Sequence, residues 1–287
     1  MNYNKELKLL KLFKFRFNNF TIFISNVFLR ILPKKLKSNK ELIIKKYKIK
    51  HDNRYIKVYG FFPRNSVKES MIYFHGGAFY LKGAPYHYAL CKEYASKGNI
   101  NVFYVVYSLS PKTKYPKAIT EGLTVYEWLI KNSDSLNISK DIALSGDSAG
   151  SNIVLGLDIM LKEKGIIPKF NMLIYPVIDN IKTKSKEMFK NTPMWNSKQN
   201  EGMWKRYLGD VKYDSIFNHK ISINTYIETC EMDPLHDEGI MYYEHLNNVK
   251  CILNETKGTM HGYDLLYKSN IAKENINKRI EFIQKMK

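Results

Sequence analysis

Residues 142–154, IALSGDSAGSNIV, are the part of this sequence that most restricts the fold. A short apolar run leads into Gly146-Asp147-Ser148-Ala149-Gly150, and an apolar, helix-compatible pattern follows. Small neighbours tolerate a strained strand-to-helix turn and leave a serine hydroxyl exposed at the edge of a sheet. The pattern therefore predicts a nucleophile elbow. A single G-x-S-x-G match is also typical of ordinary loops, so this interpretation requires partners elsewhere in the chain.

Strands and helices alternate along the chain from about residue 53 onward. Such alternation predicts an α/β fold with a mostly parallel central sheet flanked by helices on both faces. Helical patterns cover residues 117–131, 151–164 and 271–285, whereas residues 179–224 predict an irregular, partly helical insertion between two strands. The predicted strands are Tyr55–Phe62, Ser70–Phe74, Asn101–Tyr107, Asp141–Ser145, Asn171–Tyr175, Thr225–Thr229 and Lys250–Asn254.

The bulk composition limits the class of protein. A chain of 287 residues with 44% hydrophobic residues can bury the core of one α/β domain. The net charge of +19 invites a nucleic-acid hypothesis, but the lysines are scattered rather than clustered, so we expect no specific nucleic-acid binding. Three widely spaced cysteines, Cys91, Cys230 and Cys251, predict core thiols in a reducing compartment, and hence a cytoplasmic protein.

The N-terminal segment, residues 5–40, is basic at both ends and rich in Phe, Leu and Ile. Its longest charge-free run, Phe17–Leu29, has about thirteen residues, fewer than the roughly twenty that span a bilayer as a helix. No small-residue cleavage site of the signal-peptide kind follows this run. Two interpretations stay open: a helix that folds back over the active site, which we favour, or an amphipathic helix peripheral to a membrane.

Candidate partners of the serine follow two later strands. A serine hydroxyl needs a base to take its proton, and a carboxylate to orient that base. His261 lies in the Gly-flanked loop GTMHGY, and Asp233 follows a strand in ETCEMDPLHDEG. Taken singly, the first is compatible with an ordinary loop histidine and the second with a helix-capping aspartate. Together, the chain order Ser148, Asp233, His261 is that of an α/β-hydrolase triad.

A loop of small residues predicts the donors for an oxyanion. His75-Gly76-Gly77-Ala78 follows the predicted strand 70–74, and its glycines leave their amides accessible. We expect the amides of Gly76 and Gly77, with that of Ala149, to form the oxyanion hole. His75 is expected to brace the loop rather than to take part in catalysis.

With these motifs in place, the chain resembles the hormone-sensitive-lipase-like branch of the α/β-hydrolases, a group of carboxylic ester hydrolases. The resemblance runs from about Met71 to Tyr263 through HGGAFYLKG, YSLSPKTKYPKA, IALSGDSAGSN, LIYPVID, DPLHDEG and MHGY. It implies Ser148 as nucleophile, His261 as base and then acid, and Asp233 as orienter. It further implies a cap made of residues 1–45 and 180–224, placed over a catalytic core of residues 46–179 and 225–287.

Two positions depart from the family pattern. Ala78 stands where a third glycine is usual, which predicts a more restricted oxyanion loop with both glycine donors kept. The usual Y-R-L-A-P-E reads Tyr107-Ser108-Leu109-Ser110-Pro111-Lys112 here, so we expect the charged network of that Arg and Glu to be missing. We expect such a loss to affect the stability of the fold or the fine positioning of this loop, and not the chemistry of the reaction.

The predicted activity is hydrolysis of short- to medium-chain acyl esters through an acyl-serine, with no metal and no cofactor. The aromatic residues Phe79, Tyr80, Trp195 and Trp204 indicate an apolar acyl site. The partner is a small-molecule ester, and the sequence does not determine the oligomeric state. Two alternatives stay open: an amidase or formamidase that uses the same triad, and a non-catalytic small-molecule receptor on the same scaffold.

Overall fold

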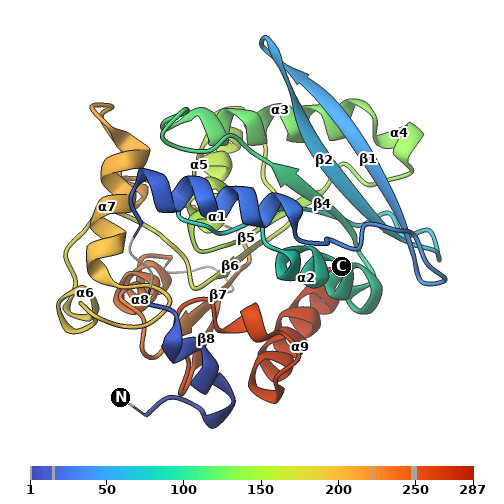
Figure 1. Cartoon of the computed structure of the whole chain (residues 1–287). Coiled ribbons are helices and arrows are strands. Elements are labelled where there is room, and N and C mark those ends of the chain that lie inside the picture. The colour runs from blue at the N-terminus through green and yellow to red at the C-terminus, as the bar shows by residue number, and fades with distance from the viewer. Residues whose placement is uncertain (1, 15–16, 222, 247–250) are drawn as a thin grey trace.

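A computed structural model describes residues 2–14, 17–221, 223–246 and 251–287. Its central feature is one eight-stranded sheet in the order β1-β2-β4-β3-β5-β6-β7-β8 (Figure 1). The strands are β1 (Leu42–His51), β2 (Arg54–Pro63), β3 (Ser70–Phe74), β4 (Asn101–Val106), β5 (Ile142–Asp147), β6 (Asn171–Ile174), β7 (Thr225–Cys230) and β8 (Cys251–Thr256). The α-helices are α1 (Asn19–Ile31), α2 (Pro85–Gly98), α3 (Lys117–Lys131), α4 (Ser133–Leu136), α5 (Ala149–Glu163), α6 (Lys184–Met188), α7 (Ser197–Leu208), α8 (His236–His245) and α9 (Asn270–Lys285). Three 3-10 helices complete the described elements: η1 (Lys5–Leu12), η2 (Ile216–Asn218) and η3 (Tyr263–Leu266).

The sheet is parallel except at one edge. β1 pairs antiparallel with β2, and β2 pairs antiparallel with β4, whereas the pairs from β4 through β8 are all parallel. Strands β3, β5, β6 and β7 are buried along their whole length, as parallel strands covered on both faces must be. In the register of β3 with β5, Phe74 lies opposite Gly146. The loops that follow these two strands therefore leave the sheet side by side.

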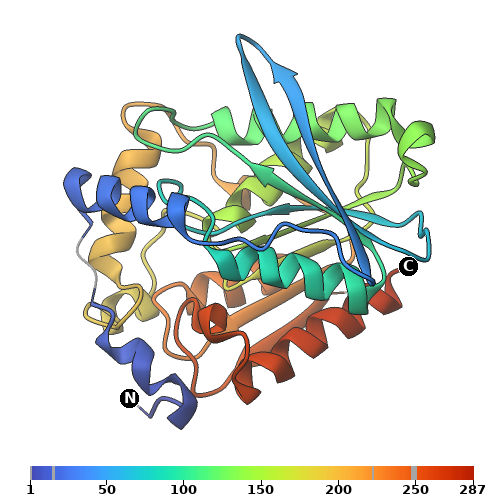
Figure 2. The same cartoon turned by 45° about the vertical axis from the view of Figure 1, so that its right-hand side comes forward.

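Helices cover both faces of the sheet (Figures 1 and 2). On one face, α3 and α5 pack on the sheet through apolar residues such as Leu129 and Ile153. On the other face, α2 and α9 pack through residues such as Tyr94, Ile276 and Ile280. The two layers bury separate hydrophobic clusters, and the sheet lies between them. This arrangement confirms the predicted α/β architecture.

The N-terminal elements and the insertion after β6 lie next to one another. α1 and α7 are neighbours in both views, and the guanidinium of Arg206 in α7 donates to the backbone oxygen of Phe17 at 3.1 Å. Met194, in the insertion, donates its backbone N–H to the oxygen of Phe13 at 2.8 Å. Segments about 180 residues apart in the sequence thus form one layer beside the sheet.

The predicted strands all occur, with end shifts of one or two residues; Lys250, the predicted start of the last strand, lies outside the described residues. Among the longer elements, the edge strand β1 and the helix α2 were not predicted, and neither were the short helices α4 and η3. β1 begins at Leu42, so this strand crosses the predicted boundary at residue 45 between the N-terminal segment and the core.

Candidate functional site

Ser148 occupies the sharp turn between β5 and α5. Its backbone has φ 53° and ψ −120°, a conformation that costs energy for a residue with a side chain. The turn brings α5 against the neighbouring strand: a Cβ on Gly150 would lie 2.0 Å from the backbone oxygen of Phe74. Only glycine fits at position 150. The sequence therefore closes the turn so tightly that the serine is held in the strained conformation of a nucleophile elbow.

His261 and Asp233 meet Ser148 at the same edge of the sheet. Asp233 follows β7 and His261 follows β8, so the two loops leave adjacent parallel strands. Nε2 of His261 lies 2.8 Å from Oγ of Ser148, and Nδ1 of His261 lies 2.6 Å from Oδ2 of Asp233. The other carboxylate oxygen of Asp233 accepts the backbone N–H of Leu235 at 3.0 Å. All three side chains are buried, which excludes competing water from the hydrogen-bonded chain.

The loop after β3 runs beside the elbow. Gly77 has φ 125°, a conformation that side-chain-bearing residues rarely adopt. Within the described part of the chain, no protein acceptor takes up the amides of Gly76, Gly77 or Ala149. These amides come from the two adjacent loops that follow β3 and β5. Ala78 lies in the left-handed region at φ 55°, a conformation that costs energy for a residue with a side chain.

His75 is held inside the protein rather than at the site. Its ring is stacked on Tyr107 with centroids 4.5 Å apart, and its Nδ1 lies 2.6 Å from the backbone oxygen of Gly76. Burial, reinforced by the neighbouring His87, lowers the pKa of His75 to about 3. The hydroxyl of Tyr107 donates to the backbone oxygen of His75 at 2.7 Å. These contacts fit the bracing role expected for His75.

Asp147, directly before the serine, makes contacts that the sequence analysis did not anticipate. Its carboxylate accepts the Tyr73 hydroxyl at 2.5 Å and lies 3.2 Å from Nε2 of His87. Burial alone would raise the pKa of Asp147, but the interactions with His87 and Tyr73 outweigh it and hold that pKa below its usual value. A carboxylate thus ties the elbow to β3 and α2. Its partners come from distant parts of the chain, so no local pattern signalled them.

A charged network also surrounds Ser108, where the family arginine is absent. The carboxylate of Glu121 in α3 accepts the backbone N–H of Ser108 at 2.7 Å and its hydroxyl at 2.5 Å. Arg54, on β2, lies 3.3 Å from the same carboxylate. The family's own Arg and Glu are missing as expected from the sequence, but an arginine from another strand supplies a cation at this loop.

The four aromatic residues singled out from the sequence occupy different places. Trp195 lies closest to the triad, with its ring centroid 5.9 Å from that of His261. Phe79 stacks face to face on Tyr207 at 3.6 Å, and Trp204 packs beside it at 6.2 Å. All four are buried. Tyr80 instead forms part of a cavity wall, so Trp195 is the best placed of the four to contact a group bound beside His261.

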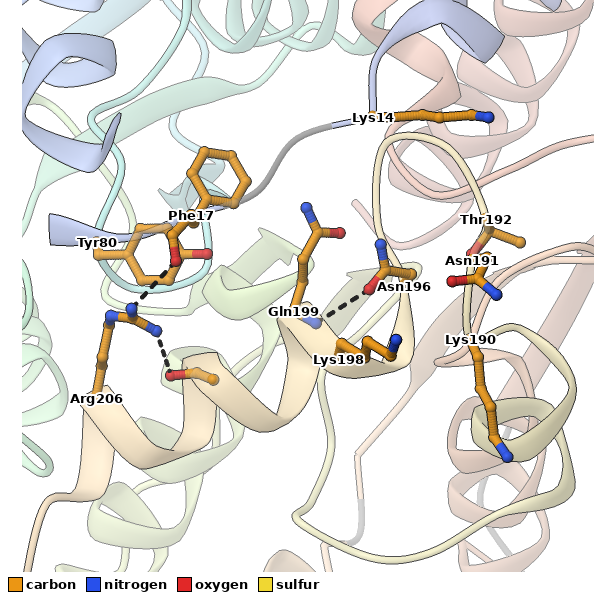
Figure 3. A pocket seen from close by; sticks show the side chains of 11 residues that line it. Lys14, Phe17, Tyr80, Lys190, Asn191, Thr192, Asn196, Lys198, Gln199 and Arg206 are labelled. Atoms are coloured by element: carbon orange, nitrogen blue, oxygen red, sulfur yellow. Dashed lines mark hydrogen bonds between the residues drawn. The ribbon is translucent and has the colours of Figure 1, made fainter. Parts of the chain in front are cut away.

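A cavity of about 710 Å³ lies between the N-terminal segment and α7 (Figure 3). Tyr80 and Thr192 are among its lining residues, and Thr192 donates its hydroxyl to the backbone oxygen of Trp195 at 2.6 Å. Arg206 also lines the cavity. Its guanidinium donates to the backbone oxygens of Phe17 and Gly202 and lies 5.9 Å from the centre of the Tyr80 ring. The lining carries positive charge from Lys14, Lys190, Lys198 and Arg206.

This fold and this arrangement of serine, histidine and aspartate define an α/β-hydrolase. Residues 71–265 match the family described as the alpha/beta hydrolase fold. The chain therefore belongs to this family, in its hormone-sensitive-lipase-like branch.

Two curated relatives extend the comparison. The chain is 29% identical to "Putative alpha/beta hydrolase R526" of Acanthamoeba polyphaga mimivirus over 212 residues, which are 68% of this chain and 61% of the relative. It is 25% identical to "Ethyl acetate hydrolase" of Pseudomonas putida over 189 residues, 62% of this chain and 59% of the relative. The chain thus spans about three fifths of the length of these relatives.

The fold also matches solved structures along almost the whole chain. Esterase LipW from Mycobacterium marinum superposes with a TM-score of 0.92 at 21% identity, covering 99% of this chain and 96% of that one. At this identity the similarity establishes the fold alone. It includes the N-terminal segment and the insertion after β6, because nearly every residue is covered.

Proposed function

We propose that this protein is a serine carboxylic ester hydrolase. The observation that carries the proposal is the hydrogen-bonded chain from Ser148 Oγ to His261 Nε2 at 2.8 Å, and from His261 Nδ1 to Asp233 Oδ2 at 2.6 Å. With Nδ1 carrying the proton that faces Asp233, Nε2 is free to accept the serine proton. Family membership and relatives named "Esterase" and "Acetyl esterase" support the same conclusion.

In the proposed reaction, Oγ of Ser148 attacks the ester carbonyl carbon while its proton passes to Nε2 of His261. The carbonyl oxygen becomes an oxyanion, which accepts hydrogen bonds from the amides of Gly76, Gly77 and Ala149. Collapse of this intermediate breaks the carbon–oxygen bond, and His261 gives the proton to the leaving alcohol. No step so far calls for a metal or a cofactor.

The second half of the reaction regenerates the enzyme. Water attacks the acyl-Ser148 carbonyl, His261 again takes the proton, and the acid departs when the proton returns to Oγ. Asp233 keeps the imidazole oriented and stabilises the imidazolium formed in both halves. Its second oxygen is held by the backbone N–H of Leu235, so the carboxylate has a fixed position for this purpose.

We propose that residues 1–41 and 180–224 act as a cap over this site, which restricts the acyl chain to short or medium length. The contacts of Arg206 with Phe17 and of Met194 with Phe13 join the two parts of the cap. Trp195, buried beside His261, gives this enclosure an apolar wall. A relative named "Acetyl esterase" is consistent with small acyl groups. Association of the basic N-terminal segment with a membrane is a separate proposal, which depends on the outer surface of this cap.

The test is hydrolysis of a p-nitrophenyl ester series, from acetyl to long acyl chains, by the purified full chain and by Ser148→Ala. We expect activity that peaks at short or medium chains. Loss of the nucleophile should lower kcat by about 10^4- to 10^6-fold. Ser135→Ala is the matched control, because Ser135 is an exposed serine on α4 and should keep wild-type activity.

Equal rates for wild type and Ser148→Ala would overturn the assignment of the nucleophile. Activity on anilides or formamides but not on esters would instead favour the amidase alternative, which shares the same triad. Ligand binding with no turnover on either class would favour a receptor. The intact hydrogen-bonded chain argues against that last outcome, because a receptor has no need to keep all three groups in place.

A further inference from the structure

The outward face of α1 is apolar. Six of its residues form a stripe with helical spacing, and each is exposed, from 41% at Val27 to 76% at Ile31. Exposed side chains of this size cover on the order of several hundred Å², which is as large as the largest patch of a typical soluble monomer. The stripe consists of Phe20, Phe23, Ile24, Val27, Phe28 and Ile31.

The inward face of α1 is partly polar and is attached to the body of the protein. Asn26 donates to the backbone oxygen of Tyr80 at 2.8 Å and accepts the backbone N–H of Lys82 at 2.7 Å. Ile22 is the buried apolar residue of this helix. A surface helix of a soluble protein ordinarily turns its apolar stripe to the core and its polar residues to water. In α1 this orientation is reversed, so the stripe is available to an apolar partner.

Cations gather at the C-terminal end of the stripe. Lys34 donates to the backbone oxygen of Leu29 at 2.9 Å, and Arg30 lies in the last turn of α1. Partial burial, together with the nearby positive charges of Arg30 and Lys57, lowers the pKa of Lys82. The first forty residues contain ten lysines and arginines and one acidic residue, Glu6. An anionic partner would relieve this mutual repulsion.

The preceding element, η1, repeats the pattern. Leu9 and Leu12 are 64% and 79% exposed and alternate with the exposed Lys8 and Lys11. In both views α1 lies beside α7, and η1 lies lower on the molecule, where it contacts η3 (Figures 1 and 2). Exposed apolar groups interspersed with lysines are typical of segments that lie in the headgroup region of a bilayer.

We propose that the stripe on α1 docks this protein on the surface of an anionic lipid bilayer. The charges favour this partner over a second copy of the chain, because two copies, each with a net charge of +19, repel one another. The thirteen residues of α1 extend for about 20 Å, less than the roughly 30 Å of a hydrocarbon core. Among the described residues no helix is long and apolar enough to cross a membrane. The helix therefore lies in the plane of the surface.

Docking through the outer face of α1 leaves one helix diameter, about 10 Å, between the bilayer and the loop that contains Tyr80. Asn26 is bonded to Tyr80, whose own N–H donates to the backbone oxygen of Gly77 at 3.0 Å. Lys14 and Phe17, from the N-terminal segment, line the cavity described above. Esters dissolved in the bilayer surface would thus meet the protein beside the candidate site. The docking itself does not depend on the proposed esterase activity.

The test is co-sedimentation of the purified full chain with lipid vesicles. Ser148→Ala protein is used, so that no hydrolysis of lipid affects the result. We expect binding to vesicles of phosphatidylcholine mixed with an equal amount of phosphatidylglycerol, and at least about tenfold weaker binding to phosphatidylcholine alone. Replacing Phe20, Phe23 and Phe28 together by serine should lower the partition coefficient by at least about 100-fold.

The matched control is Ile167→Ser, since Ile167 is 70% exposed and Phe20 is 71% exposed. This variant should bind as the unmodified protein does. Circular dichroism checks that the triple variant stays folded. No binding to anionic vesicles, or equal binding by the triple variant, would overturn the proposal. So would a stable dimer in gel filtration that the triple variant converts to a monomer, because the stripe would then be a self-association surface.

Discussion

Asp158 is a carboxyl group buried in α5, the helix that begins at the candidate nucleophile. Burial raises its pKa to about 6, against the opposing effects of a hydrogen bond from Asn171 and the charge of Lys162. Asn171 donates to one carboxylate oxygen at 2.6 Å, while its own Oδ1 is buried and has no partner among the described residues. Protonation of Asp158 is therefore easier in the folded chain than in the unfolded chain, chiefly because the carboxyl group is buried.

This preference predicts how stability depends on pH. Because the pKa of Asp158 is higher in the folded than in the unfolded chain, its contribution is complete below about pH 4 and is lost as the pH rises through about 6. Asp158→Asn should raise the free energy of unfolding near pH 8 by about 1–3 kcal/mol. It should also flatten the decline between about pH 4 and pH 7. Urea unfolding across this range measures both effects.

Asp141→Asn is the control for this prediction, because Asp141 is exposed just before β5. It should keep the wild-type pH profile. Glu238, whose pKa is raised to about 7 chiefly by burial, contributes a decline of the same sign in wild type and in both variants. A profile for Asp158→Asn that stays parallel to that of wild type would show that Asp158 titrates normally in the folded protein.

At the scale of single residues, the sequence predicted those that belong to motifs. It missed those whose role depends on partners far away in the chain. Ser148, Asp233 and His261 could be found because each follows a strand in a short pattern of small or turn-forming residues. Asp147 lies in the same pattern, but its role depends on Tyr73 and His87, far away in the chain. Arg54 is still less visible, since only the folded sheet brings it to Glu121.

At the scale of elements, Arg279 joins α9 to the rest of the core. Its guanidinium donates to both carboxylate oxygens of Glu228 in β7, at 2.9 and 2.6 Å, and to Asp264 in η3 at 2.8 Å. It also donates to the hydroxyl of Tyr94 in α2 at 3.1 Å. The arginine and both acids are fully buried, so each charge depends on the others for compensation. Tyr175 donates its hydroxyl to Asp264, and its ring packs edge-on against the ring of His261.

We expect the fold to lose much of its stability when the guanidinium of Arg279 is removed. Arg279→Met keeps much of the volume but leaves two buried carboxylates without a counter-charge, so the free energy of unfolding should fall by about 3–5 kcal/mol. Lys278→Met is the control: Lys278 is partly exposed and pairs with Glu274 in the same helix, and its loss should cost less than about 1 kcal/mol. Thermal or urea unfolding distinguishes the two. Equal losses would mean that the buried network contributes no more than a surface pair.

The elements that the sequence predicted are those with a strong hydrophobic period or a wholly apolar run, such as α3 and β3. β1 was missed because LIIKKYKIKH places a lysine at four of its ten positions, which an edge strand half open to water accepts. α2 was missed because PYHYALCKEYASKG buries aromatic, small and sulfur-containing side chains without a clear apolar stripe. In both elements, tertiary contacts rather than local periodicity determine the structure.

At the scale of the whole molecule, the two interpretations of the N-terminal segment concern opposite faces of one helix. The inner face of α1 is bonded to the loop that contains Tyr80, as a cap requires. The outer face carries the exposed stripe, as a membrane-docking helix requires. The sequence could not separate these faces, because the partner of each residue depends on how the helix lies on the body. The helix α1 can therefore cover the candidate site with its inner face and dock on a membrane surface with its outer face.

The excess of positive charge is likewise a property of the surface. Most lysines are exposed, and the buried arginine, Arg279, is compensated by Glu228 and Asp264. The fold and the candidate site therefore do not depend on the net charge of +19. Its effect should be on association with anionic surfaces, where salt would weaken it.

The central claim is that Ser148 is a nucleophile activated by His261. A fluorophosphonate ester, which phosphonylates activated serines with loss of fluoride, tests it directly in the folded full chain. Intact mass should show one added phosphonyl group, and peptide mapping should place it on Ser148. Ser148→Ala should take up none at this position, and His261→Ala should react at least about 10^3-fold more slowly. Modification of a different serine, or equal labelling rates in wild type and His261→Ala, would contradict the account.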